Sequence, residues 1–160
     1  MARRAAPDLV GASAASIALP GRRTTTRVTF HQPARQAVLA RIDGKRPVNA
    51  YLNVENVTGS GLHGTYEVFV NTPAGDQEPL LAGHMSTFGV KKASRKDGPH
   101  GGSGTTTVLE ITPLIKRLHE ERGWDGQHLD VILVPEVPPG RKEPMPPSDL
   151  QIGRVSIYYS

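Results

Sequence analysis

Alternation of apolar and polar side chains is the feature that most limits how this chain can fold. Between residues 48 and 55 an apolar side chain occupies every second position, beginning with Val48, Ala50 and Leu52. A period of two is that of a β-strand with one buried face. Residues 66–71 repeat the pattern, and Phe69 adds an apolar side chain to the otherwise polar face. Such two-sided apolarity is typical of a strand that is also partly covered on its outer face.

Turn-forming residues divide the rest of the chain into short segments. Of its 160 residues, 17 are Gly and 14 are Pro, which favours short strands joined by loops. β-Branched runs at 24–30 and 105–111 predict further strands. One short helix is expected to begin at Thr112-Pro113 and to end at Gly123. We therefore predict a mostly β fold, a β-sandwich or jelly-roll-like domain with one short α-helix.

The length of the chain is that of one domain. Residues 1–22 are rich in Ala and end at Pro20-Gly21, which predicts a linker, so residues 23–160 are expected to form a single β-sandwich domain. The N-terminus carries two arginines, but Pro7 and Asp8 interrupt the apolar stretch that a signal peptide needs. No apolar run approaches the ~20 residues of a membrane helix. We expect a soluble chain of the bacterial cytoplasm or periplasm.

Composition and charge limit the partners. The formal net charge is +4, but the chain has one Trp and three Phe, and no aromatic ladder accompanies the basic residues. Solvated surface charge therefore explains the basic balance better than nucleic-acid binding does. We expect neither a nucleic acid nor a membrane as partner. The absence of Cys excludes disulfides, zinc-thiolate sites and a thiol nucleophile.

The sequence contains no catalytic constellation. Its six His are scattered, and no H-x-x-x-H pair occurs, so the chain alone should not hold a dicopper site, whose imidazoles must converge. There is no G-x-S-x-G elbow. His84 and Met85 are weak candidates for a copper(I) relay, but adjacent residues of a strand point to opposite faces. We predict that the chain binds no metal and is not an enzyme.

One strand and the loop after it carry a family resemblance. Residues 66–71 read Y-E-V-F-V-N, and residues 82–88 read A-G-H-M-S-T-F. This pair resembles the C-terminal domain of polyphenol oxidases and tyrosinases, in which the strand reads like K-F-D-V-Y-V-N and the loop like A-G-S-F-V-N-L. Further segments resemble that domain in the same order, namely residues 105–115, 129–135 and 150–157. Residues 7–13 resemble the linker that follows the copper domain in bacterial members.

The resemblance implies a shielding role. In this family the C-terminal domain does no chemistry, covers the dicopper site of the catalytic domain and keeps the enzyme latent. The implied partner is thus the catalytic dicopper domain of a bacterial tyrosinase or polyphenol oxidase, on the same precursor or as a separate polypeptide. The dicopper centre would belong to that partner. The resemblance also allows a role in folding or copper loading.

The resemblance assigns a plug to the loop. Counted from Ala82-Gly83, Phe88 lies where the plant proteins have a Leu, and in this family an apolar side chain of the domain enters the substrate pocket over the coppers. Val90 and Met85 remain rivals for this role. On the residues alone, Phe88 is equally well a core anchor at a strand end.

The residues after Phe88 are expected to form a docking loop. Its cations are Lys91, Lys92, Arg95 and Lys96. Glycine density and positive charge predict that residues 85–104 are mobile or depend on the partner for order.

A free-standing β-sandwich module that binds carbohydrate or another extended ligand is the alternative. Such a module needs an exposed aromatic platform. The candidates are Tyr51, Tyr158, Tyr159 and Trp124. They do not share an obvious strand face.

Overall fold

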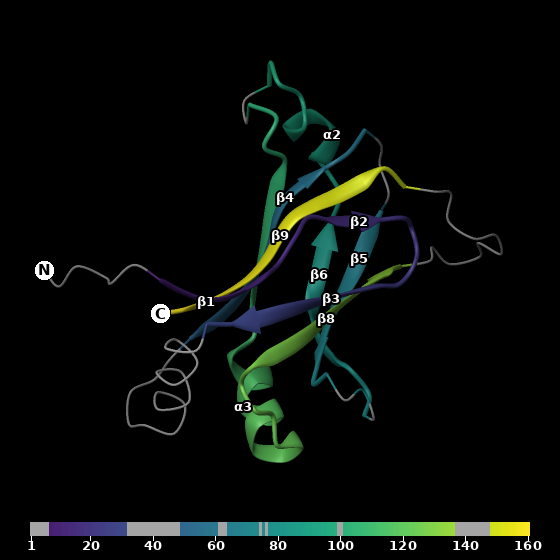
Figure 1. Cartoon of the computed structure of the whole chain (residues 1–160). Coiled ribbons are helices and arrows are strands. Elements are labelled where there is room, and N and C mark those ends of the chain that lie inside the picture. The colour runs from purple at the N-terminus through teal and green to yellow at the C-terminus, as the bar shows by residue number, and fades with distance from the viewer. Residues whose placement is uncertain are drawn as a thin grey trace, which may run out of the picture.

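The computed structural model describes residues 7–31, 49–60, 64–73, 75, 77–98, 101–136 and 148–160. Nine strands lie in these ranges (Figure 1): β1 (Asp8–Ser13), β2 (Ile17–Leu19), β3 (Thr24–Phe30), β4 (Ala50–Thr58), β5 (Thr65–Asn71), β6 (Leu80–Ser86), β7 (Thr105–Glu110), β8 (His128–Pro135) and β9 (Leu150–Tyr159). The described part also contains two short helices, α2 (Val90–Ala93) and α3 (Thr112–Arg122). The prediction of a mostly β fold is confirmed.

The strands form one antiparallel sheet that curls until its ends meet. The order along the sheet is β6-β5-β8-β3-β1-β9-β4-β7, and β2 pairs with β9 beside this path. The two end strands approach each other where Gly83 of β6 faces Leu109 of β7. A Cβ added at Gly83 would lie 2.8 Å from Leu109 Cδ2. The sheet is therefore nearly closed into a barrel, which encloses the core.

The alternation read from the sequence defines the core of the barrel. In β4, Ala50, Leu52 and Val54 are buried, whereas Tyr51 and Asn53 are only half-buried. Val48, the first apolar residue of that pattern, lies outside the described residues. β3 and β5 bury alternate residues in the same way, so the pattern of period two and the curled sheet have one physical cause, the removal of apolar surface from water.

The linker predicted for residues 1–22 is wrong for residues 8–19. β1 pairs with both β3 and β9, and β2 pairs with β9. Gly11 makes this possible because a side chain there would meet Val28 Cγ1 at 3.0 Å. Val10 and Leu19 are buried in the core. The prediction failed because the small residues of this segment show little alternation. The segment is held instead by backbone hydrogen bonds to strands on either side of it.

The helices lie at opposite ends of the barrel (Figure 1). α3 was predicted, with Pro113 in its first turn and Gly123 in the left-handed conformation after it. Thr112 Oγ1 does not cap this helix but accepts a hydrogen bond from Ala50 N at 2.9 Å, which joins α3 to the start of β4. α2, which the sequence did not predict, lies at the other end of β4, where Gly59 N donates to Ser94 Oγ at 3.0 Å.

Candidate functional site

A single aromatic ring projects from the α2 end of the barrel. Phe88 is 84% exposed, the highest value among the exposed large apolar residues of the described part. It lies in the tight turn between β6 and α2. The residue before it, Thr87, is 1% exposed, and Val90 is fully buried. The reading of Phe88 as a core anchor is therefore wrong.

Hydrogen bonds fix the turn on its inner side. Thr87 donates twice to the carbonyl of Gly64, from its backbone N at 3.1 Å and from Oγ1 at 2.6 Å. Phe88 N donates to Ser86 Oγ at 3.1 Å. Gly89 takes the left-handed conformation, with φ 82°, that lets the chain turn directly into α2. The backbone on both sides of the ring is thus held in place.

α2 is packed onto the barrel. Val90 and Ala93 are buried, and Ser94 Oγ donates to the carbonyl of Val90 at 2.6 Å. Gly104 N donates to the carbonyl of Ala93 at 3.1 Å. The expectation of a loop at residues 85–104 is therefore wrong for residues 85–94, which are built into strand, turn and helix. That the segment is mobile or depends on a partner for order stays a prediction.

The other two residues considered for insertion into a partner's pocket do not reach the surface. Met85 and Val90 are both fully buried in the core, because β6 and α2 direct these side chains inward. Among the three residues singled out from the sequence, only Phe88 is presented to solvent.

The predicted docking cations follow this turn along the chain. They are all exposed: Lys91, Lys92, Arg95 and Lys96. Lys91 and Lys92 occupy the outer face of α2, since Val90 and Ala93 take the inner one. The sequence thus predicted the charge of this segment, and the structure adds that two of its cations, Lys91 and Lys92, are displayed from a packed helix.

The weak metal candidates do not converge. His84 is exposed and its Nδ1 lies 2.7 Å from Glu136 Oε1, whereas Met85 is buried on the opposite face of β6. Within the described ranges, no group of three or more His, Cys, Asp or Glu side chains is placed to hold a metal ion. In the same part of the chain, no helix is long and apolar enough to cross a membrane.

Of the four aromatic residues proposed as a platform for a carbohydrate-binding module, two are buried. Trp124 is 4% exposed and stacks edge-on against Phe30, with ring centroids 5.2 Å apart, and Tyr159 is 1% exposed. Tyr51 and Tyr158, by contrast, lie directly opposite each other on β4 and β9. They therefore share the outer face of the sheet, which the sequence pattern did not show.

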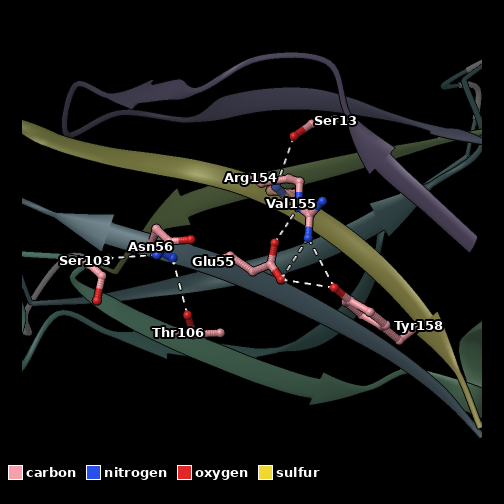
Figure 2. A network of polar contacts seen from close by, with 8 residues as sticks. All are labelled: Ser13, Glu55, Asn56, Ser103, Thr106, Arg154, Val155 and Tyr158. Atoms are coloured by element: carbon pink, nitrogen blue, oxygen red, sulfur yellow. Dashed lines mark hydrogen bonds and ion pairs between the residues drawn. The ribbon is translucent and has the colours of Figure 1, made fainter. Parts of the chain in front are cut away.

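A polar network that the sequence did not reveal lies on the same outer face (Figure 2). Arg154 of β9 donates to both carboxylate oxygens of Glu55 on β4, at 2.6 and 3.3 Å, and to Tyr158 Oη at 3.2 Å. The hydrogen bond that Arg154 donates to the Glu55 carboxylate raises the pKa of Arg154 above its ordinary value. Glu55 and Arg154 are partners across the paired strands β4 and β9. Because they are far apart in the sequence, their opposite charges were the only sign of this pair before the strand pairing was known. Because both charges are already matched, we regard this network as a clamp between strands.

Comparison with solved structures gives plant enzymes. Latent apple tyrosinase matches with a TM-score of 0.49 and 20% identity, over 91% of this chain and 27% of that chain. Latent aurone synthase (polyphenol oxidase) from natural source matches with a TM-score of 0.48 and 16% identity, over 89% and 26%. The recombinantly expressed latent aurone synthase (polyphenol oxidase) matches with a TM-score of 0.47 and 15% identity, over 89% of this chain and 25% of that chain. This chain therefore spans 25–27% of the length of those structures.

Comparison with curated protein sequences gives no match. A family model described as Domain of unknown function (DUF7868) matches residues 6–160. The chain belongs to the DUF7868 family.

Proposed function

We propose that this chain is the non-catalytic shielding domain of a dicopper phenol oxidase, and that it keeps the enzyme latent by inserting Phe88 into the substrate pocket of the catalytic domain. The observation that carries the proposal is the exposure of Phe88 on a turn whose neighbours are buried. A ring held in water while Thr87 and Val90 are buried has no role in the core of this domain. It is available to a pocket of another protein.

The geometry suits insertion. Burial of a Phe side chain contributes about 1.5–3 kcal/mol. Because the hydrogen bonds of Thr87 and the packing of Val90 already order the turn, little of that energy is lost on ordering the backbone when it binds. A phenyl ring also has the shape of a phenol without the hydroxyl that is oxidised.

The sequence resemblance supports the same proposal. The two segments that carry it, residues 66–71 and 82–88, form the paired strands β5 and β6 and the turn that presents Phe88. The resembling segments thus belong to one substructure.

Inhibition of a catalytic domain by single-residue variants tests the proposal. The assay would follow catechol oxidation by the dicopper domain encoded on the same precursor or in an adjacent reading frame, with this chain added at increasing concentration. Phe88→Ala should weaken inhibition about ten- to a hundredfold. Leu81→Ala is the matched control, because Leu81 is an apolar residue of β6 that is also exposed, at 48%. Its inhibition should equal that of the unchanged chain.

Two outcomes would contradict the proposal. One is the absence of inhibition by the unchanged chain. The other is inhibition by Phe88→Ala that is as strong as that by Leu81→Ala.

A further inference from the structure

The cations beside Phe88 are unmatched within the described part of the chain. Residues 86–98 contain four cations and one acid, Asp97, so the segment carries a formal charge of 4 − 1 = +3. None of the four is in an ion pair there, whereas Arg27 pairs with Asp130 and Arg154 with Glu55. The charge of this surface is therefore not compensated by the fold.

The cations lie a few residues after the ring in the sequence, and α2 fixes the first two of them. Lys91 and Lys92 follow Phe88 by three and four residues, and α2 cannot rotate to hide them because Val90 and Ala93 are buried against the barrel. Arg95 and Lys96 extend the same exposed segment. An exposed ring and four exposed cations therefore lie within one short segment, which we call the Phe88 tip (residues 86–96).

We propose that the Phe88 tip recognises a protein surface on which an apolar pocket is bordered by carboxylates, and that attraction between these charges makes latency sensitive to ionic strength. This inference rests on the proposed function, and it adds the chemistry of the partner's surface and a means of regulation. A pocket that accepts one ring, with acids on its border, matches both the shape and the charge of the tip. Exposed charges of opposite sign accelerate association and are screened by salt.

A protein partner fits the tip better than an anionic membrane does. Stable attachment to a lipid surface needs an apolar helix face, or a lipid chain supported by a second signal such as a polybasic patch. The tip has the cations but neither the apolar face nor the lipid chain. The tip offers one apolar side chain, because Val90 and Ala93, the other apolar residues of α2, face the core. One ring is enough for a pocket but forms only a weak membrane anchor.

The test uses a pair of charge reversals with a matched control. Lys91→Glu/Lys92→Glu reverses two adjacent charges on the exposed face of α2. The control, Lys116→Glu/Arg117→Glu, makes the same change of charge on the exposed face of α3, at the opposite end of the barrel. The association rate with the catalytic domain would be measured by stopped flow at low salt and in about 1 M salt, where the screening length is about 3 Å.

At low salt the α2 variant should associate about ten- to a hundredfold more slowly than the unchanged chain, and the control should differ from it by less than about threefold. In 1 M salt the three proteins should associate at similar rates. Equal rates for the α2 variant and the control at low salt would overturn the inference.

The failure of this inference is distinguishable from that of the proposed function. If Phe88→Ala weakens inhibition while the α2 variant and salt have no effect, the proposed insertion of Phe88 is supported, and the inference of carboxylates around the pocket is wrong. A second arm measures sedimentation with vesicles of phosphatidylcholine and phosphatidylserine. Binding that is lost in both Phe88→Ala and the α2 variant, with no effect of either on the catalytic domain, would assign the tip to membranes and overturn both proposals.

Discussion

Thr87 and Phe88 are consecutive residues, yet Thr87 is 1% exposed and Phe88 is 84% exposed. Thr87 directs its hydroxyl inward to the carbonyl of Gly64, at 2.6 Å. The exposed ring therefore does not mark a loose loop. It is supported by a buried, hydrogen-bonded residue, and a binding element built in this way enters a complex with its backbone already ordered.

The contrast between Phe88 and Val90 predicts opposite effects of truncation on stability. Phe88→Ala should change the free energy of unfolding by less than about 0.5 kcal/mol, because an exposed side chain contributes little to the core. Val90→Ala removes methyl groups from a fully buried position and should destabilise the domain by about 1–3 kcal/mol. Urea unfolding of the isolated chain measures both. A loss for Phe88→Ala as large as that for Val90→Ala would show that the ring packs in the domain.

A single bulge explains why the exposure of Phe88 could not be predicted from the alternation of residues alone. In β6, Leu80 and Ala82 face the core, but the next inward residues are Met85 and Thr87. The register shifts in the pairing of β5 with β6 opposite Val68 and Phe69. Alternation counted from Leu80 would have placed Phe88 inside. One extra residue reverses which face each later side chain occupies. The local signal is Gly83, because a glycine inside a strand often marks a bulge.

The strands with strong alternation were predictable, and the elements held by tertiary contacts were not. β4 follows the pattern read from its apolar residues, and α3 begins beside Pro113 as expected. β1 has little alternation and depends on pairing with β3 and β9. α2 is four residues long, too short to be stable on its own, and exists because Val90 and Ala93 pack on the barrel.

Two glycines of the α2 region should respond differently to the same substitution. Gly89 has φ 82° and open space around its Cβ position, so Gly89→Ala should cost only backbone strain, about 1–2 kcal/mol. Gly104 has φ 80°, and a Cβ there would overlap with the backbone of Val57, whose carbonyl carbon would be 2.7 Å away. Gly104→Ala should therefore destabilise the domain by more than about 3 kcal/mol.

Urea unfolding of the two variants checks this order. Gly89→Ala should also weaken inhibition of the catalytic domain, because strain at this position moves the turn that carries Phe88. Equal stabilities would mean that β4 and the segment before β7 do not approach as closely as the structure shows.

The clamp between β4 and β9 should appear as a coupling energy. A double-mutant cycle with Glu55→Ala and Arg154→Ala should give about 0.5–1 kcal/mol of coupling, since the pair is bidentate and Glu55 is only 16% exposed. The exposed pair Arg117–Glu121 of α3 is the control. Its cycle should give about 0.3–0.5 kcal/mol or less. The prediction fails if the two couplings are equal, which would mean that Tyr158 and the strand pairing add nothing to the clamp.

Tyr159 should make the domain sensitive to alkali. Burial raises the pKa of this side chain above its ordinary value of 10.0, and its Oη has no hydrogen-bond partner in the described part of the chain. Because the folded-state pKa is the higher one, the stability linked to Tyr159 is fully present below pH 10 and is lost as the pH rises towards the folded-state pKa. The loss amounts to about 1.4 kcal/mol for each pH unit above 10.

Tyr159→Phe should remove this dependence. At pH 8 the variant should be as stable as the unchanged chain or more stable by about 1–2 kcal/mol, because a buried hydroxyl without a partner is unfavourable. At pH 11 the advantage of the variant should be larger by about 1.4 kcal/mol. Burial also raises the pKa of Tyr66, but that residue is present in both proteins and its contribution cancels in the difference. Urea unfolding at the two pH values measures the change, and an advantage that is the same at pH 8 and pH 11 would show that Tyr159 can ionise within the folded barrel.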